Sequence, residues 1–198
     1  MQIEVANTLH GVDAGQWDSI NTDNNPFTSY AFLLGLEKTG CVGGRTGWSP
    51  RYLLAWDTEH KLTAALPMYE KQHSWGEYVF DWAWANAWHQ YGIEYYPKLV
   101  VAVTFSPVTG RRMLVSPAGR KNAVEQVLLK SAIDYAVEHS QSSIHFLFPT
   151  SVECNELKQQ GLLIRHDVQF HWCNANYADF SSFLATLSSR KRKKIARE

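Results

Sequence analysis

The chain has 198 residues, of which 45% are hydrophobic and 19% are charged, a composition that excludes a disordered protein. Its 19 basic and 19 acidic residues balance, so net charge favours neither nucleic acid nor an anionic membrane as a partner. The three cysteines are far apart and exclude a disulfide framework. Together with the lack of a signal peptide at the N-terminus, they lead us to expect a cytoplasmic protein. The longest apolar runs fall far short of the roughly 20 residues that cross a bilayer, so we expect no transmembrane segment.

The first quarter of the chain predicts a strand at 2–6, a short helix near 17–20 and a stronger helix that starts at Asn25-Pro26. Asparagine caps helices, and proline suits the first helical position, where its missing N–H costs nothing. The glycine-rich stretch 41–50 lacks the lysine and the spacing of a phosphate-binding loop, so we interpret it as a connection between a helix and a strand.

Two strands are predicted at 51–56 and 61–71, joined by a turn at 57–60. Pro67 lies inside the second strand. Proline cannot donate a ladder hydrogen bond, so it predicts an edge, a bulge or a bend at that point.

The stretch 75–98 carries four of the eight tryptophans, with tyrosines and polar residues between them. A helix is predicted within 78–91 and ends at Gly92. Rings with a polar handle are typical of ligand surfaces, whereas plain cores use leucine, isoleucine and valine. This stretch is therefore the first candidate for a site, and an aromatic core helix is the alternative.

The rest of the chain predicts an α/β (α+β) fold with a mixed sheet and helices on both of its faces. Two features are specific: Asn122 and Glu125 resemble a capping box, and Asp179 caps a last helix that runs into the basic block 190–194. The remaining predicted helices lie after residue 122 and at 151–160. The remaining predicted strands lie at 99–105, 113–115, 143–148 and 162–177, the last as one long strand or as two strands with a kink.

Several phrases resemble one known family, among them NPFTSYAFL at 25–33, GEYVFDWAWANAWHQYGIEYYPKL at 76–99 and VTFSPVTGRR at 103–112. The chain is similar to predicted N-acyltransferases labelled peptidoglycan biosynthesis or recognition proteins. These bacterial proteins are related to Fem-type aminoacyl transferases of the GNAT superfamily. The resemblance implies a GNAT-type fold with an aromatic-rich helical insert. It also implies transfer of an acyl group from a thioester or an aminoacyl-tRNA to an amine.

Relatives in this family have two GNAT-like lobes, so the resemblance implies that residues 1–178 form the N-terminal lobe. The basic helix at 179–198 would then lead to a second lobe that this chain does not contain. The stretch VSPAGRKNA at 115–123 departs from the usual GNAT pyrophosphate-loop pattern. That departure puts coenzyme A binding by this lobe in doubt and suggests that the donor sits in the missing lobe.

Acyl transfer to an amine needs a base, donors for the carbonyl oxygen and a group that protonates the leaving group. We expect Asp81, His89 and Tyr95 to act in catalysis. The expected substrate-binding residues are Trp84, Trp88, Tyr91, Glu94, Tyr96 and Lys98. The expected donor-binding residues come from the arginine-containing turn: Thr109, Gly110, Arg111 and Arg112.

The sequence supports three hypotheses for the function. The first is an N-acyltransferase that uses acyl-CoA or aminoacyl-tRNA and acts on a small molecule or a cell-wall precursor, with a second lobe or an oligomer partner. The second is a non-catalytic module that recognises peptidoglycan fragments through its aromatic rings. The third uses the basic block to bind tRNA. We expect no metal, because His166, His171 and Cys173 are too few and too irregularly spaced for a metal site.

Overall fold

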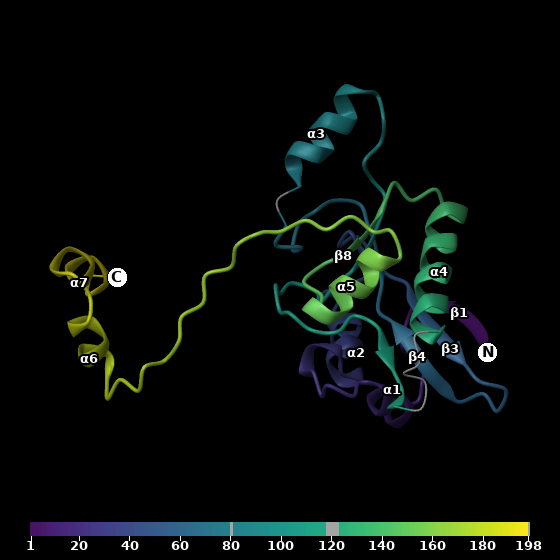
Figure 1. The fold of residues 1–198 in the computed structure, drawn as a ribbon, viewed down its shortest axis with the longest axis horizontal. Helices are drawn as coiled ribbons and strands as arrows, with labels where there is room; N and C mark the ends of the chain where they lie inside the picture. The colour runs from purple at the N-terminus through teal and green to yellow at the C-terminus, as the bar shows by residue number, and fades with distance from the viewer. Residues whose placement is uncertain (80, 118–122, 198) are drawn as a thin grey trace. The chain divides into compact units, whose positions relative to one another are not determined.

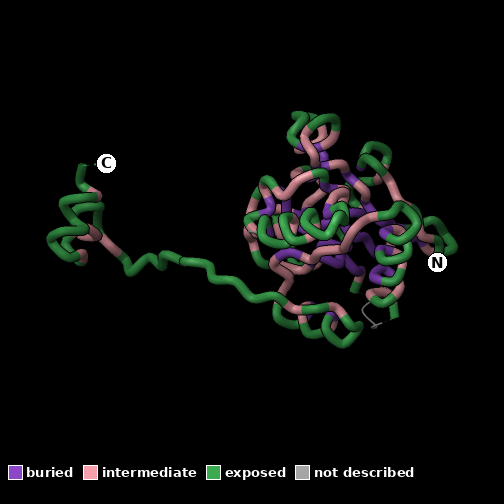
Figure 2. The backbone as a smooth tube through the Cα atoms, turned by 90° about the horizontal axis from the view of Figure 1, so that it is seen from above, coloured by how far each residue is buried: buried purple, intermediate pink, exposed green. Residues whose placement is uncertain are grey.

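The computed structural model describes residues 1–79, 81–117 and 123–197. The chain divides into two compact units, Met1–Leu163 and Ile164–Glu198. Figure 2 shows that the buried residues gather in the first unit, whereas the second is exposed along most of its length. The first unit therefore contains the hydrophobic core, and each unit is described separately.

The first unit contains both strands and helices (Figure 1). Its elements are β1 (Gln2–Ala6), α1 (Ala14–Ile20), the 3-10 helix η1 (Pro26–Thr28), α2 (Tyr30–Lys38), β2 (Trp48–Pro50), β3 (Tyr52–Trp56), β4 (Leu62–Leu66), β5 (Tyr69–Lys71), α3 (Trp82–Gln90), β6 (Lys98–Val101), β7 (Leu114–Val115), α4 (Ala123–Glu138), β8 (Ile144–Phe146) and α5 (Ser151–Gln159). The second unit holds α6 (Phe180–Ala185) and α7 (Ser189–Ile195).

The strands form two four-stranded sheets, with the orders β1-β3-β4-β7 and β2-β5-β6-β8. All pairs in the first sheet are antiparallel, whereas the second also contains the parallel pair β6–β8. Helix α4 lies between β7 and β8 in the chain and so connects the first sheet to the second. The α+β class predicted from the sequence is confirmed, and its strands are shared between two sheets.

A bent two-stranded ribbon links the two sheets. One strand of this ribbon consists of β2 and β3, and the other of β4 and β5. In the second of these, β4 ends at Leu66 in the first sheet and β5 begins at Tyr69 in the second sheet. Opposite this break, the backbone N–H of Arg51 donates to Met68 O at 2.8 Å. Pro67 lies in the break, where its missing N–H interrupts no ladder. The bend predicted at this proline is confirmed.

The first sheet is buried on both faces. Strand β3 is buried at every position, and its side chains alternate between two hydrophobic clusters. Leu53 and Ala55 pack with residues of α4 and α5, whereas Tyr52 and Leu54 pack with residues of α1 and α2. Helices therefore cover both faces, as the sequence predicts (Figure 1).

Helix α3 and the turn after it, residues 82–93, form what we call the aromatic arm. The helix begins one residue after Asp81, and Gly92 with a φ of +70° follows its end. None of its residues is buried. The helix predicted within 78–91 is thus confirmed in type, although Phe80 lies outside the described residues.

Two predicted helices are each divided in two. Asn25 caps η1 and Ser29 then caps α2, so the single helix predicted from Asn25-Pro26 has a break at Ser29. Asp179 caps α6 as predicted, but α6 ends at Ala185 and a separate α7 carries the basic block. The capping box predicted at Asn122 lies outside the described residues.

Two strand predictions are wrong in extent or in type. Strand β6 ends at Val101 instead of reaching residue 105, and Phe105 has a φ of +56°, which a strand does not contain. The strand predicted at 162–177 is irregular, and none of the ladders among the described residues includes it. A strand needs a neighbour for its backbone groups, and alternation alone does not supply one.

The packing of α4 gives a direct stability prediction. Leu128 is fully buried in the cluster between α4 and the first sheet, whereas Val137 on the same helix is 75% exposed. We expect Leu128→Ala to lower the free energy of unfolding by about 2–5 kcal/mol, because it leaves a cavity. Val137→Ala should change it little. Urea unfolding followed by circular dichroism measures both, and equal effects would contradict this account of the core.

Candidate functional site

A buried charge cluster lies where the aromatic arm joins the second sheet. Lys71 ends β5 and Lys98 begins β6, and the sheet register places these two lysines directly opposite each other. Both are fully buried. Like charges at directly opposed positions repel, and isolated ammonium groups are costly to bury. The pair therefore requires negative partners, which Glu77 and Asp81 supply.

Lys98 is the hub of this cluster. Its Nζ donates to Asp81 Oδ2 at 2.5 Å, to Glu77 Oε2 at 2.8 Å and to Ser74 Oγ at 2.9 Å. The two carboxylates are themselves only 2% exposed. Because an ammonium group has three donors, these three bonds use all of them. Lys98 therefore fixes the chain on the N-terminal side of α3 to β6.

Lys71 is held more loosely. Its Nζ lies 3.6 Å from the centroid of the Trp48 ring, donates to Trp75 O at 3.2 Å and lies 4.0 Å from Glu77 Oε1. Burial, together with the neighbouring Lys98 charge, lowers the pKa of Lys71 to about 7 despite the attraction of Glu77. Lys71 is thus the side chain in this cluster that can release a proton near neutral pH.

The two carboxylates differ in their pKa shifts. Burial raises the pKa of Glu77 above its ordinary value, and the attraction of Lys98 and Lys71 only partly offsets that effect. Burial acts in the same direction on Asp81, but hydrogen bonds from Lys98 and Tyr95 and the charge of Lys98 outweigh it and lower the pKa of Asp81. Asp81 is therefore firmly ionised and accepts a proton poorly, which disfavours its expected role as a base.

Tyr95 closes the cluster on the other side of the arm. Its hydroxyl donates to Asp81 Oδ2 at 2.8 Å, and burial raises its pKa, so the phenol keeps its proton. The ring makes edge-on contacts with Trp88 of α3 at 5.5 Å and with Tyr96 at 5.1 Å. The Tyr96 hydroxyl lies 2.8 Å from Ser74 Oγ. Both ends of the arm are thus connected to the same buried carboxylate.

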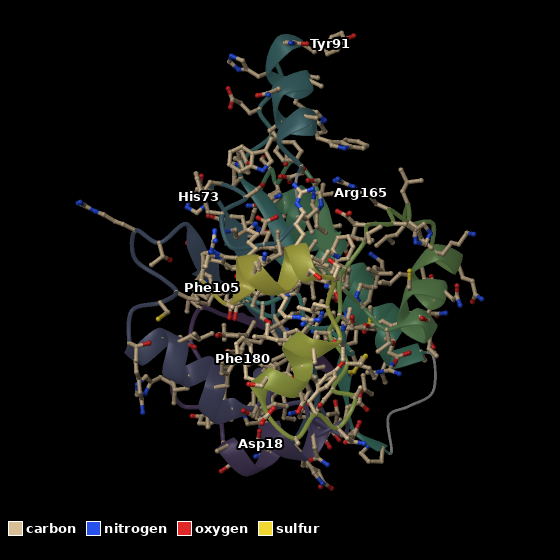
Figure 3. The ribbon with its side chains drawn as sticks, turned by 90° about the vertical axis from the view of Figure 1, so that its left-hand side faces the viewer. Asp18, His73, Tyr91, Phe105, Arg165 and Phe180 are labelled. Carbon is tan, nitrogen blue, oxygen red and sulfur yellow. The ribbon has the colours of Figure 1, made fainter. Side chains whose placement is uncertain are left out.

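The structure divides the predicted catalytic and substrate-binding residues into two groups. Asp81, Tyr95, Tyr96 and Lys98 come together at the root of the arm, and Trp88 reaches them through its contact with Tyr95. The other group consists of exposed residues on the arm or directly after it, namely Trp84, His89, Tyr91 and Glu94. Figure 3 shows Tyr91 at the end of α3 that is remote from the sheets.

The predicted donor-binding turn is occupied mainly by internal contacts. Arg112 is buried, and its guanidinium donates to the carbonyl oxygens of Leu147, Val108 and Phe148. The Gly110 N–H donates to Phe148 O at 3.2 Å, and Thr109 is exposed. Arg112 therefore stabilises the turn, and its side chain is not directed to solvent.

Arg111 is more accessible than Arg112. Its Nη2 pairs with Glu125 of α4 and lies 4.0 Å from Glu156 of α5, and its side chain is 22% exposed. Two carboxylates beside one guanidinium leave less positive charge for a phosphate ligand. The role of the whole turn in donor binding stays a prediction.

Sequence reasoning missed Lys71 as a site residue and left Glu77 and Ser74 without a role. A lysine at the end of the strand predicted at 61–71 was the available signal for Lys71. Its position opposite Lys98 depends on the register of β5 against β6, which the sequence does not reveal.

The cluster has polar capacity left over. Glu77 Oε1 and Asp81 Oδ1 are buried and have no hydrogen-bond partner among the described residues. Each oxygen can accept a hydrogen bond from an N–H or O–H donor. The described residues hold no group of three or more histidine, cysteine or acidic side chains placed for a metal ion. The described helices include none that is long and apolar enough to cross a membrane.

Removing Lys98, the hub of the cluster, should make the folded protein less stable. We expect Lys98→Met to lower the free energy of unfolding by about 3–5 kcal/mol, because two buried carboxylates lose their main partner. The matched control is Lys130→Met, which removes an exposed lysine paired with Asp134 on α4. Chemical unfolding should show no measurable change for the control. A small effect at Lys98 would show that this lysine is not the main partner that offsets the two buried carboxylates.

Lys71 should make stability depend on pH. Its folded pKa of about 7 lies below the ordinary value of 10.5, so between these values the unfolded chain holds a proton that the folded protein has released. As pH rises through this window, the cost of burying the charged lysine in the folded state disappears, so the free energy of unfolding increases. Lys71→Met should lose this increase in unfolding measurements across the window. The same slope in both proteins would show that Lys71 titrates normally.

Comparisons with known proteins concern the family and the fold of this chain. A family model described as FemAB-like, peptidoglycan biosynthesis/recognition, matches residues 8–198. No curated protein matches the chain. The structure of the aminoglycoside 6'-N-acetyltransferase AAC(6')-IG from Acinetobacter haemolyticus is similar at a TM-score of 0.50 and 15% identity, covering 89% of this chain and 100% of that chain.

The ribosomal-protein-alanine N-acetyltransferase from Brucella melitensis biovar Abortus 2308 has a TM-score of 0.49 and 13% identity, covering 88% of this chain and 99% of that chain. At such low identity a structural likeness concerns the fold alone. The first likeness shows an acetyltransferase-type fold and confirms the GNAT-like architecture predicted from the sequence. Because the family model spans nearly the whole sequence, this chain belongs to the FemAB-like family of peptidoglycan biosynthesis and recognition proteins.

Proposed function

We propose that this protein acts in an N-acyltransferase that moves an acyl or aminoacyl group to an amine of a small molecule or a cell-wall precursor. The observation that carries the proposal is the family match across residues 8–198. The fold of this chain supports the same proposal, because the structurally similar Acinetobacter haemolyticus protein is by its name an N-acetyltransferase.

The proposed reaction makes one bond and breaks one bond. The lone pair of the acceptor amine attacks the carbonyl carbon of the donor and forms a C–N bond. The C–S bond of an acyl-CoA, or the C–O bond of an aminoacyl-tRNA, breaks, and the thiol or hydroxyl leaves. The amine proton passes to a base, and the leaving group takes up a proton.

We assign the proton acceptor to His89. Its imidazole is exposed on α3, so an acceptor amine can reach it, and histidine is the side chain best suited to exchange protons near neutral pH. Asp81 is buried and its lowered pKa makes it a weak base. In this proposal Asp81 and Lys98 are positioning residues that fix Tyr95 and the root of the aromatic arm.

The substrate would lie along the exposed side chains of the aromatic arm. Trp84 and Tyr91 provide apolar faces with an N–H or O–H handle, and Glu94 provides a negative charge for an ammonium group or a hydroxyl. The donor is an acyl-CoA or an aminoacyl-tRNA, and Arg111 is the more accessible arginine of the predicted donor turn. The basic residues of α7 support a contact with tRNA.

One observation favours a second candidate function, recognition of peptidoglycan fragments without chemistry. Trp75, Trp82 and Trp84 are all more than half exposed, and exposed indole rings can stack on sugars. This module would bind muropeptides but form no acyl product.

The experiment that separates the two incubates the protein with acyl-CoA or aminoacyl-tRNA and with cell-wall precursor peptides or small amines. Mass spectrometry should detect an acceptor that has gained the acyl mass. Tryptophan fluorescence titrations with muropeptides and with acetyl-CoA run in parallel. Muropeptide binding with no acylated product from any donor would favour recognition and contradict the transferase proposal.

Substitutions test the assigned residues. We expect His89→Ala to lower turnover by about 10²-fold or more, because it removes the proton acceptor. The control, His10→Ala, changes an exposed histidine far from the arm in sequence and should leave turnover unchanged. Thermal unfolding checks that both variants fold. Unchanged turnover in His89→Ala would remove this residue from the mechanism.

A further inference from the structure

The aromatic arm combines exposure with a complete lack of formal charge. Residues 82–93 include no aspartate, glutamate, lysine or arginine. Yet Trp84 is 56%, Tyr91 83% and Ile93 54% exposed. Surfaces of stable soluble domains carry roughly a quarter to a third charged residues. An exposed helix and turn without one charge are therefore not an ordinary solvated surface.

Three aromatic side chains of the arm share one face of α3. Trp84, Trp88 and Tyr91 follow one another at spacings of four and three residues, which places them on one face of α3. Next to the helix start, the rings of Trp75 and Trp82 meet edge to face with centroids 5.3 Å apart. Trp88 contacts the Tyr95 ring, with centroids 5.5 Å apart, but no residue of α3 is buried, so Trp84 and Tyr91 on this face stay exposed.

The charges nearest to the arm are hidden. Lys71, Glu77, Asp81 and Lys98 lie at its root, but all four are buried and their formal charges balance. Glu94, directly after the arm, is the first exposed charge that follows. The charged side chains at the root of the arm are therefore buried, whereas the aromatic side chains of the arm are exposed and uncharged.

This combination matches the chemistry of a lipid–water interface. Tryptophan and tyrosine concentrate at membrane interfaces, where the ring is in an apolar layer and the N–H or O–H stays hydrated. Protein interfaces also use these rings, but they surround them with a polar rim that includes charges. The arm has only Asn86, His89 and Gln90 as polar side chains, which suit headgroups and need no charged partner.

We propose that the aromatic arm docks into the lipid–water interface of a bilayer and anchors the protein peripherally, without spanning the membrane. The contact depends on apolar burial and not on attraction between charges. It should therefore occur on zwitterionic lipid and be insensitive to salt. Trp84 and Tyr91 are also the rings that the proposed function assigns to the substrate, so the two proposals share one surface. Lipid binding itself needs neither donor nor acceptor, and it can be tested without any transferase activity.

The test is flotation of the whole chain with vesicles of phosphatidylcholine alone, at low and at high salt. We expect the protein to float with the vesicles at both, and its tryptophan emission to shift to shorter wavelength. Trp84→Ser combined with Tyr91→Ser should weaken partitioning by about tenfold or more, since each ring contributes apolar burial. Ala87→Glu, which adds a charge beside the same face, should weaken it as well.

Phe170→Ser is the matched control, because Phe170 is 98% exposed but lies outside the arm. It should leave partitioning unchanged, and circular dichroism should show that all variants fold. Three results would overturn the proposal: no flotation of the unmodified chain, an equal loss in Phe170→Ser, or flotation only on anionic vesicles at low salt. A dimer that forms without lipid and disappears in the double variant would assign the surface to a second copy instead.

Discussion

The structure around the arm depends on two lysines that face each other across neighbouring strands. Lys71 and Lys98 are opposed in the register of β5 and β6, and both are fully buried. Such a pair is unstable by itself, so the sheet tolerates it only when acids approach. Glu77 and Asp81 come from the loop before α3, and their approach fixes where that loop enters the fold. The neutralisation of two strand residues thus determines the position of the aromatic arm.

The bend at Pro67 makes this arrangement possible. It moves the chain from β4 in the first sheet to β5 in the second, and Lys71 ends that short strand. The first sheet is occupied on both faces by hydrophobic clusters, so it has no room for buried charges. The second sheet carries them instead. The fold therefore separates a hydrophobic core, which provides stability, from a polar region at the root of the arm.

Much of this organisation could be predicted from the sequence, because it is local. Helix caps, the bend at Pro67 and the helix of the aromatic stretch depend on neighbouring residues, and that stretch alone indicates Asp81, Tyr95 and Lys98 as candidates. Lys71 could not be paired with Lys98, because register is a long-range property. Arg112 resembled a ligand-binding arginine in sequence, but its bonds to three carbonyl oxygens depend on the segment near Phe148. The segment 162–177 alternates like a strand, but alternation does not specify a neighbouring strand.

The uncharged arm and the charged root meet two physical requirements that would otherwise conflict. A surface rich in indole and phenol rings lowers its free energy when it moves from water into a less polar environment. Any charge that moved with it would oppose the transfer. Acidic and basic residues are nevertheless needed to hold the arm in place, because α3 has no buried residue of its own. Placing these charges in a balanced, buried cluster satisfies both requirements. Trp88 and Tyr95 connect the two regions, since their rings meet at 5.5 Å and the Tyr95 hydroxyl reaches Asp81. A substrate or a lipid headgroup that binds at the exposed face of the arm is therefore one ring contact away from the carboxylate that Lys98 holds.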